Sequence, residues 1–106
     1  MSIETEVLWL DEHRVVSLTE LVEVSGLRED ELLDLVHSGA LPTRDEPGGG
    51  VVFNARVVTM ARTACRLRDD FELDTRGLAV ALRLLERVRD LEGEVARLRA
   101  QLPQLR

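Results

Sequence analysis

The pattern of hydrophobic and polar positions predicts two short helices joined by a tight turn. Ser17-Leu18-Thr19-Glu20 has the form of a capping box, in which the serine hydroxyl and the glutamate carboxylate each satisfy a backbone amide, so a helix is predicted over about residues 18–24. Gly26 supplies the left-handed residue that ends it. A second helix is predicted over residues 27–38, with an apolar face of Leu32, Leu33, Leu35 and Val36. Two such helices around a glycine-containing turn form a helix-turn-helix pattern.

The middle of the chain predicts a β-ribbon, or wing, and then a third helix. A charged turn and the glycine triplet 48–50 precede Val51-Val52-Phe53, which is typical of a short strand. Asn54 can cap a helix over about residues 55–71. Its apolar positions (57, 60, 61, 64, 67 and 71) predict a face toward the core, and four arginines are expected to point elsewhere: Arg56, Arg62, Arg66 and Arg68. Weak alternation around Val7, Trp9 and Val15 indicates a short strand or an extended arm.

The clearest periodic signal lies in the last helix, which is predicted to begin near Thr75 behind the cap Asp74 and to end at Pro103. Apolar residues recur there at alternating spacings of four and three, the heptad rhythm of a coiled-coil seam. β-Branched residues at a and leucines at d favour two strands, so we expect a homodimer. The flanking charges leave the strand direction, parallel or antiparallel, open. The seam consists of Leu84, Val88, Leu91, Val95, Leu98, Leu102 and Leu105.

The length of the chain, 106 residues, gives room for one compact domain with a projecting element. We expect residues 1–74 to form a helix-turn-helix domain with its wing and third helix, and residues 75–106 to form a C-terminal amphipathic helix. A chain of this size has little room for a deep catalytic pocket. An enzyme is therefore not expected.

Charge is unevenly distributed along the chain. Fourteen basic residues, all of them arginine, stand against 20 acids, so the net charge is 14 − 20 = −6. Residues 1–48 carry 3 − 12 = −9, whereas residues 49–106 carry 11 − 8 = +3. The half that contains the helix-turn-helix pattern is therefore the acidic half.

Few residues offer other chemistry. Cys65 has no second cysteine to pair with and is expected to be packed or half-buried. Neither His13 nor His37 has a partner at metal-ligand spacing, so we expect no metal site and no cofactor. No apolar run approaches the roughly 20 residues that cross a bilayer, and the first residues lack the pattern of a secretory signal. A cytoplasmic protein is expected.

The motifs together resemble a known family. The helix-turn-helix SLTELVEVSGLREDELLDLVHSGALP, the wing ending in VVF and the arginine-containing third helix are similar to the N-terminal half of MerR-type regulators. Within that group, RLRDDFELDTRGLAVALRLLERVRDLEGEVARLRAQL is most similar to the chaperone modulator CbpM family. The resemblance covers about residues 15–103. Its most specific part is the GLAVAL segment that precedes the heptads.

The resemblance implies a mainly α fold: a MerR-like winged helix-turn-helix with a short β-ribbon wing and a long C-terminal dimerisation helix. It also implies a protein that binds the J-domain of a CbpA-type, DnaJ-like co-chaperone and inhibits the co-chaperone's activity, with a further effect on its DNA binding left open. Members of the family are not catalysts and need no cofactor. The resemblance does not identify the residues that make the contact.

Charge separates this function from the alternative, a MerR-type DNA-binding transcriptional regulator. The second helix of the helix-turn-helix carries Arg28 against four acids, a balance of 1 − 4 = −3, and carboxylates near phosphates oppose binding. In the wing, Arg44 is followed by two further acids. Direct binding of nucleic acid is therefore disfavoured, although the arginines of the third helix remain an argument for it.

An acidic surface instead suits a basic protein partner. J-domains, as a family, carry a Lys/Arg-rich second helix next to their His-Pro-Asp loop, which an acidic helix could cover. Trp9 can be interpreted as an exposed apolar anchor for the partner or as a core residue, and the second interpretation is preferred. The predicted partner-binding residues are Glu29, Asp30, Glu31, Asp34, Asp45 and Glu46.

Overall fold

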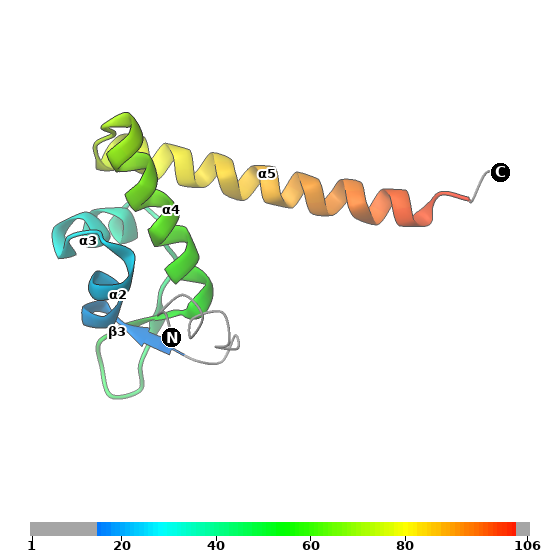
Figure 1. The fold of residues 1–106 in the computed structure, drawn as a ribbon. Helices are drawn as coiled ribbons and strands as arrows, with labels where there is room; N and C mark the ends of the chain where they lie inside the picture. Colours follow the sequence, from blue (N-terminus) through cyan, green and yellow to red (C-terminus); the bar gives the residue numbers. More distant parts are fainter. Residues whose placement is uncertain (1–14, 104–106) are drawn as a thin grey trace, which may run out of the picture.

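A computed structural model describes residues 15–103 and shows a helical head from which one long helix projects (Figure 1). Strands and helices follow the predicted order, with the helix ends within two residues of their predicted positions. The fold class, mainly helical with a small wing and a long last helix, is confirmed. The elements are β1 (Val15–Ser17), α2 (Leu18–Ser25), α3 (Glu29–His37), β2 (Arg44–Asp45), β3 (Val51–Asn54), α4 (Ala55–Phe71) and α5 (Thr75–Gln101).

Three of the four described helices, α2, α4 and α5, begin behind a residue whose side chain caps them. Ser17 Oγ accepts a hydrogen bond from the Glu20 amide at 3.1 Å, and the Ser17 amide donates to Glu20 Oε1 at 2.9 Å, which completes the capping box of α2. Asn54 caps α4 and Asp74 caps α5, each through a side-chain oxygen that accepts from an amide three residues on. Gly26 ends α2 at φ 86°, as predicted.

The sheet has one strand more than the predicted wing. β2 pairs antiparallel with β3, which confirms the β-ribbon, and β1 pairs with the other edge of β3 to give the order β1-β3-β2. Val16 lies opposite Phe53, and both side chains are buried. The sheet therefore ties the start of the described chain to the strand that leads into α4. The expected strand or arm around Val7 and Trp9 lies outside the described residues.

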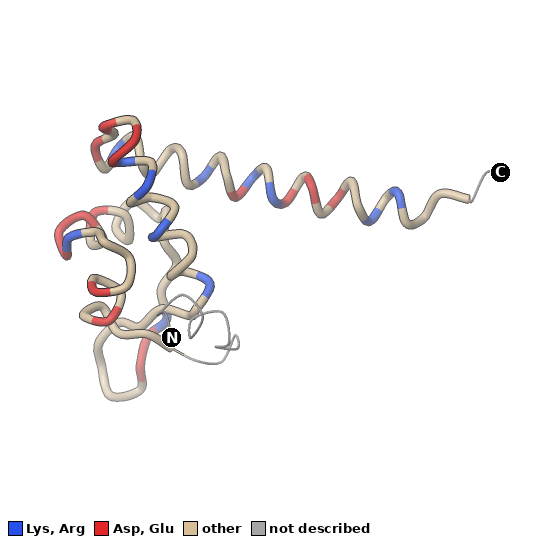
Figure 2. Tube along the Cα trace, viewed as in Figure 1, with Lys and Arg blue, Asp and Glu red and all other residues tan. Residues whose placement is uncertain are grey.

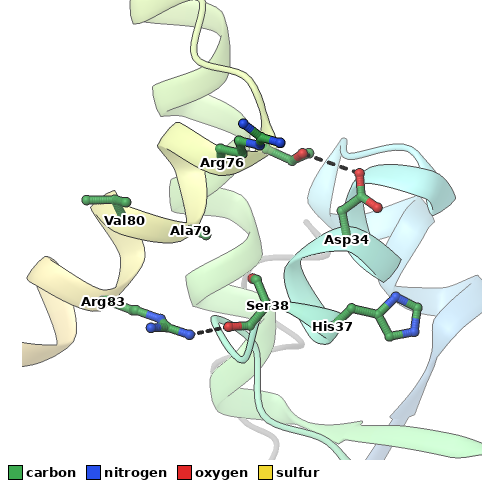
Figure 3. Close-up of a pocket in the computed structure, with 8 residues that line it drawn as sticks. Asp34, His37, Ser38, Arg76, Ala79, Val80 and Arg83 are labelled. Atoms are coloured by element: carbon green, nitrogen blue, oxygen red, sulfur yellow. Dashed lines mark hydrogen bonds between the residues drawn. The ribbon is translucent and has the colours of Figure 1, made fainter.

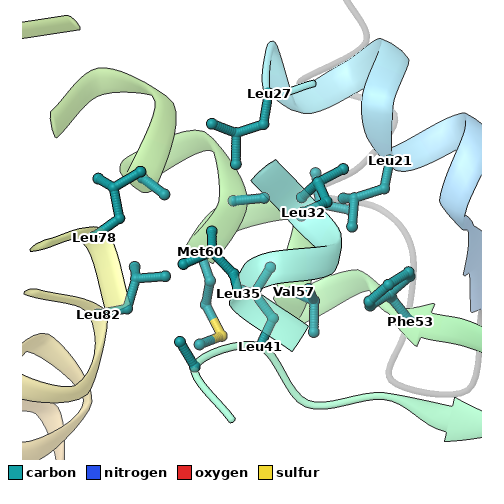
Figure 4. Packing of buried hydrophobic residues seen from close by; sticks show 14 of the residues in the cluster. Leu21, Leu27, Leu32, Leu35, Leu41, Phe53, Val57, Met60, Leu78 and Leu82 are labelled. Carbon is teal, nitrogen blue, oxygen red and sulfur yellow. The ribbon is translucent and has the colours of Figure 1, made fainter. Parts of the chain in front are cut away.

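One hydrophobic core holds the head together, and α5 contributes to it (Figure 4). Phe53 from the sheet, Leu32 and Leu35 from α3, and Leu78 and Leu82 from α5 are each no more than 3% exposed. Helices α4 and α5 thus cover the helix-turn-helix from one side. The first turns of α5 belong to the head, and only its later part projects.

Two predicted core residues are exposed instead. Leu33 is 37% exposed and Phe71 is 66% exposed. Leu33 follows Leu32 by about 100° around α3, which turns it out of the core face. Phe71 is the last residue of α4, beyond the turn at Leu67 that still packs against the core. The prediction for Leu33 placed too wide an arc of α3 in the core, and the prediction for Phe71 extended the core one turn too far along α4.

Candidate partner-binding surfaces

Glu31 holds the start of α3 in place and is not exposed. Glu31 is 5% exposed as a whole residue, and its Oε1 accepts a hydrogen bond from the Arg28 amide at 2.9 Å. Arg68 Nη1, from α4, lies 2.5 Å from the same oxygen. The expectation that Glu31 contacts a partner is therefore corrected, because its carboxylate already caps the Arg28 amide and forms a part-buried ion pair with Arg68.

Arg68 lies inside this network and does not point away from the core as predicted. Besides Glu31, its guanidinium donates to Asp69 Oδ1 at 3.0 Å and to the carbonyl of Gly26 at 3.4 Å. The hydrogen bonds to Asp69 and Glu31 raise the pKa of Arg68. Arg56, at the other end of α4, lies 3.3 Å from Glu86. Two of the four arginines in the predicted basic stripe, Arg56 and Arg68, therefore form ion pairs within the head.

The outward face of α3 combines acids with an apolar centre. Glu29, Asp30, Leu33, Asp34 and His37 are all exposed, and their spacing places them on one arc of the helix, opposite Leu32 and Leu35. Leu33 and His37 lie in the middle of this arc, with carboxylates on both sides. These five residues are called the α3 face below; it contains no arginine and no lysine.

Asp30 is the member of the α3 face with a charged neighbour. Arg28 Nε lies 3.1 Å from Asp30 Oδ1, and this hydrogen bond holds the pKa of the Asp30 carboxyl below its ordinary value. The charge of the face with Arg28 included is 1 − 3 = −2. Removing Glu31 from the predicted set therefore leaves the surface acidic.

The wing acids lie apart from the α3 face. Asp45 is in β2 and Glu46 follows it, and β2 pairs with β3 on the far side of the head from α3 (Figure 2). Asp45 is exposed and Glu46 is half-buried. The structure therefore divides the six predicted partner-binding residues into three on the α3 face, two on the wing, and the buried Glu31.

Sequence reasoning missed Leu33 and His37 as members of the surface. The acids at positions 29, 30 and 34 mark the outer arc of α3, and Leu33 falls between them on a helical wheel. That signal was available in the sequence. The leucine-rich run masks it, because Leu33 stands next to the buried Leu32.

The second candidate surface is an uncovered apolar stripe along α5. Six predicted seam residues are between 42% and 66% exposed, and every residue from 87 to 101 is exposed. A shallow groove of about 410 Å³ runs along Val88, Leu91 and Val95. Leu105 lies outside the described residues. The exposed stripe members are Leu84, Val88, Leu91, Val95, Leu98 and Leu102.

The described part of the chain offers neither a metal site nor a membrane span. Residues 15–103 contain no cluster of three His, Cys, Asp or Glu side chains that could hold a metal ion. Within the same range, no helix is long and apolar enough to cross a membrane. Cys65 is half-buried against the core, as expected for a packed cysteine.

The winged helix-turn-helix head and the projecting α5 define a MerR-type helix-turn-helix protein, and residues 16–100 match the family described as MerR HTH family regulatory protein. The chain is 34% identical over 70 residues to proteins named Chaperone modulatory protein CbpM from Salmonella arizonae and from Salmonella paratyphi B. Each match covers 66% of this chain and 69% of the relative. The chain belongs to the CbpM family of MerR-type helix-turn-helix proteins.

Proposed function

We propose that this chain is a chaperone modulator that binds the J-domain of a DnaJ-like co-chaperone through the α3 face. Binding there prevents the co-chaperone from stimulating its Hsp70 chaperone. Membership of the CbpM family supports the modulator role, since the relatives carry that name. The J-domain is the partner that the family resemblance implies, and the acidic α3 face supports a partner with a basic helix.

The composition of the α3 face is the observation on which the proposal rests. Three exposed carboxylates complement a Lys/Arg-rich helix and fix the orientation of the partner. Leu33, 37% exposed in the middle of them, supplies an apolar contact that the partner can bury. An acidic rim around an apolar centre is the arrangement expected for binding a basic protein surface.

The proposed active form is a homodimer joined through α5. Its stripe of six exposed apolar residues continues beyond the part of the helix that the head covers, and the heptad spacing suits a second copy of the same helix. This association leaves the α3 face free, because α3 packs against the first turns of α5 and the stripe begins further along.

The second candidate function is a MerR-type transcriptional regulator, with which the family match is compatible. In such a protein, α3 would be the helix that enters the major groove. Its exposed arc would then bring three carboxylates toward phosphates, without an arginine on that face. Two arginines of α4 are also engaged within the head, Arg56 with Glu86 and Arg68 with Glu31. These observations favour the modulator.

The test is a comparison of two double charge reversals in binding to a CbpA-type J-domain, measured by calorimetry. Glu29→Lys with Asp34→Lys changes the α3 face, and Asp45→Lys with Glu46→Lys makes the same change of net charge on the wing. We expect the first to weaken binding about tenfold or more at low salt and the second to change it less than about threefold. Equal losses in both would contradict the assignment to α3.

Two further measurements accompany the reversals. Leu33→Ser removes the apolar contact without changing charge and should weaken binding about tenfold. The wild-type protein should lower J-domain-stimulated ATP hydrolysis by Hsp70, and the variants should do so in proportion to their affinity. A wild-type protein that binds a palindromic promoter fragment with a steep salt dependence, and does not bind the J-domain, would favour the regulator instead.

A further inference from the structure

A groove between α3 and α5 borders the α3 face (Figure 3). It has a volume of about 570 Å³. At one end Thr75 Oγ1 donates to Asp34 Oδ2 at 3.3 Å, and at the other Arg83 Nη2 donates to the carbonyl of Ser38. These two contacts connect the helices at both ends of the groove, and Leu78 and Leu82 of α5 pack in the same core as α3. The groove is therefore part of the folded head and does not depend on how α5 projects.

The two walls of the groove differ in charge. Asp34 and His37 of the α3 face form one wall. Arg76 and Arg83 stand on the other, seven residues or two helical turns apart on α5, about 10 Å along the axis. Val80 lies between them and is 59% exposed, while the neighbouring Ala79 is 8% exposed. The α5 wall thus offers two cations around an apolar centre.

Neither arginine is neutralised by a carboxylate of residues 15–103. Arg83 donates to the Ser38 carbonyl, which leaves most of its five N–H donors available, and Arg76 has no ion pair in this range. A guanidinium binds a carboxylate through two parallel hydrogen bonds. The chemistry that completes this wall is therefore an acidic side chain whose carbon atoms can rest on Val80.

We propose that the groove receives a carboxylate side chain of the J-domain that lies beside its basic helix, while the α3 face contacts the basic helix itself. The inference rests on the proposed function and assigns Arg76, Val80 and Arg83 to the same interface. Asp34 and His37 belong to both the α3 face and the groove, so one partner can contact the two surfaces together. Adjacent patches of opposite charge define one orientation and reject a uniformly charged partner such as nucleic acid.

The experiment is a double-mutant cycle between Arg76 and the acidic residues of the J-domain. Arg76→Glu and Arg76→Gln are compared with Arg89→Glu, which makes the same charge change at an exposed position of α5 outside the groove. Each Asp or Glu beside the basic helix of the J-domain is changed to Asn or Gln. Affinities are measured by calorimetry with the full chain, and light scattering reports the mass of each variant.

We expect Arg76→Glu to weaken J-domain binding about tenfold and Arg76→Gln by less, with Arg89→Glu within about twofold of the wild type. One partner carboxylate should be coupled to Arg76, so that its loss has little further effect in Arg76→Glu. The inference is overturned if Arg76→Glu and Arg89→Glu weaken J-domain binding equally. It is also overturned if the loss of affinity from Arg76→Glu and the loss from each J-domain substitution simply multiply in the combined pair. It is also overturned if Arg76→Glu changes the mass of the protein but not the affinity. In each of these cases, J-domain binding by the wild type would still support the proposed function.

Discussion

Arg68 Nη1, near the end of α4, lies 2.5 Å from Glu31 Oε1 in the first turn of α3. The two residues are 37 positions apart in the sequence, and the Glu31 side chain is only 7% exposed. The same carboxylate oxygen accepts the amide of Arg28. One ion pair therefore connects α4 to the start of α3, the helix that carries the proposed binding surface.

Breaking this pair from the arginine side should destabilise the head. Arg68→Ala leaves the buried Glu31 carboxylate with the Arg28 amide and the more distant Arg28 guanidinium at 3.7 Å, and we expect a loss of about 2–3 kcal/mol in the free energy of unfolding. Arg66→Ala, two residues away and exposed, is the control and should cost less than about 0.5 kcal/mol. Urea denaturation followed by circular dichroism measures both; a loss in Arg68→Ala no larger than in Arg66→Ala would show that the pair contributes nothing.

The parts of the fold that local chemistry determines could be predicted from the sequence. Ser17, Asn54 and Asp74 can each satisfy an amide three residues on, and in the structure all three begin a helix. The heptad spacing likewise marked a stripe that is exposed along α5. These features depend on neighbours within one or two helical turns, which a sequence displays directly.

The candidate site was predictable only in part, because burial depends on distant neighbours. Nothing near Glu31 in the sequence indicates that Arg68 will cover it, so the sequence predicts all four acids of residues 29–34 to be exposed. The groove behind Asp34 needs Arg76 and Arg83 from a helix about 40 residues further on. Charge could be assigned to α3 from the sequence, whereas its division into buried and exposed members required the packing of α4 and α5.

The exposure of Phe71 leads to a prediction about stability. Phe71→Ser should change the free energy of unfolding by less than about 0.5 kcal/mol, because the side chain is 66% exposed at the end of α4. Phe53→Ala is the contrasting variant: its ring is 1% exposed in the core, and its loss should cost about 3–5 kcal/mol. Thermal and urea denaturation compare the two. If Phe71→Ser lowers the free energy of unfolding by more than about 1.5 kcal/mol, the Phe71 ring must pack against a surface other than the head, which contradicts this prediction.

Two glycines should respond to alanine in opposite directions. Gly93 lies within α5, where an added Cβ meets nothing within 4 Å, so Gly93→Ala should raise helix stability by about 0.5–1 kcal/mol. Gly26 has φ 86°, and a Cβ there would lie 2.8 Å from Cys65 Sγ, so Gly26→Ala should destabilise the head by about 2 kcal/mol. Melting curves and far-ultraviolet circular dichroism distinguish the two effects. A shift of the same sign in both variants would contradict the reasoning.

The reactivity of Cys65 should depend on pH differently in the folded and unfolded chain. Burial raises the pKa of the Cys65 thiol, and Asp69 adds to the effect against the opposing charge of Arg68. Because the thiolate is the reactive form, alkylation by iodoacetamide should reach half its maximal rate at a higher pH in the native protein than in guanidinium. The native state therefore binds the thiol proton more tightly than the unfolded chain does. This preference stabilises the fold fully below the unfolded pKa and is lost as the pH rises through the folded pKa. Coincident pH profiles would contradict this assignment.

Dimerisation through α5 is tested by placing charges on the exposed stripe. Leu91→Asp with Leu98→Asp introduces two carboxylates at d positions, where each would be buried against the second copy without a partner. We expect a monomer by light scattering at concentrations where the wild type is expected to be a dimer. The head should keep its fold, because neither leucine belongs to the core.

The matched control adds the same two charges to the opposite side of the helix. Gly93 and Ala100 occupy f positions of the heptad, away from the seam, and the space around a Gly93 Cβ is open. Gly93→Asp with Ala100→Asp should therefore remain dimeric although its net charge equals that of the stripe variant. If both variants dissociate, charge repulsion and not the apolar stripe governs association; if neither does, the copies meet elsewhere. Only dissociation confined to the stripe variant identifies these leucines as the interface, because the two variants differ in the side of the helix that carries the charge.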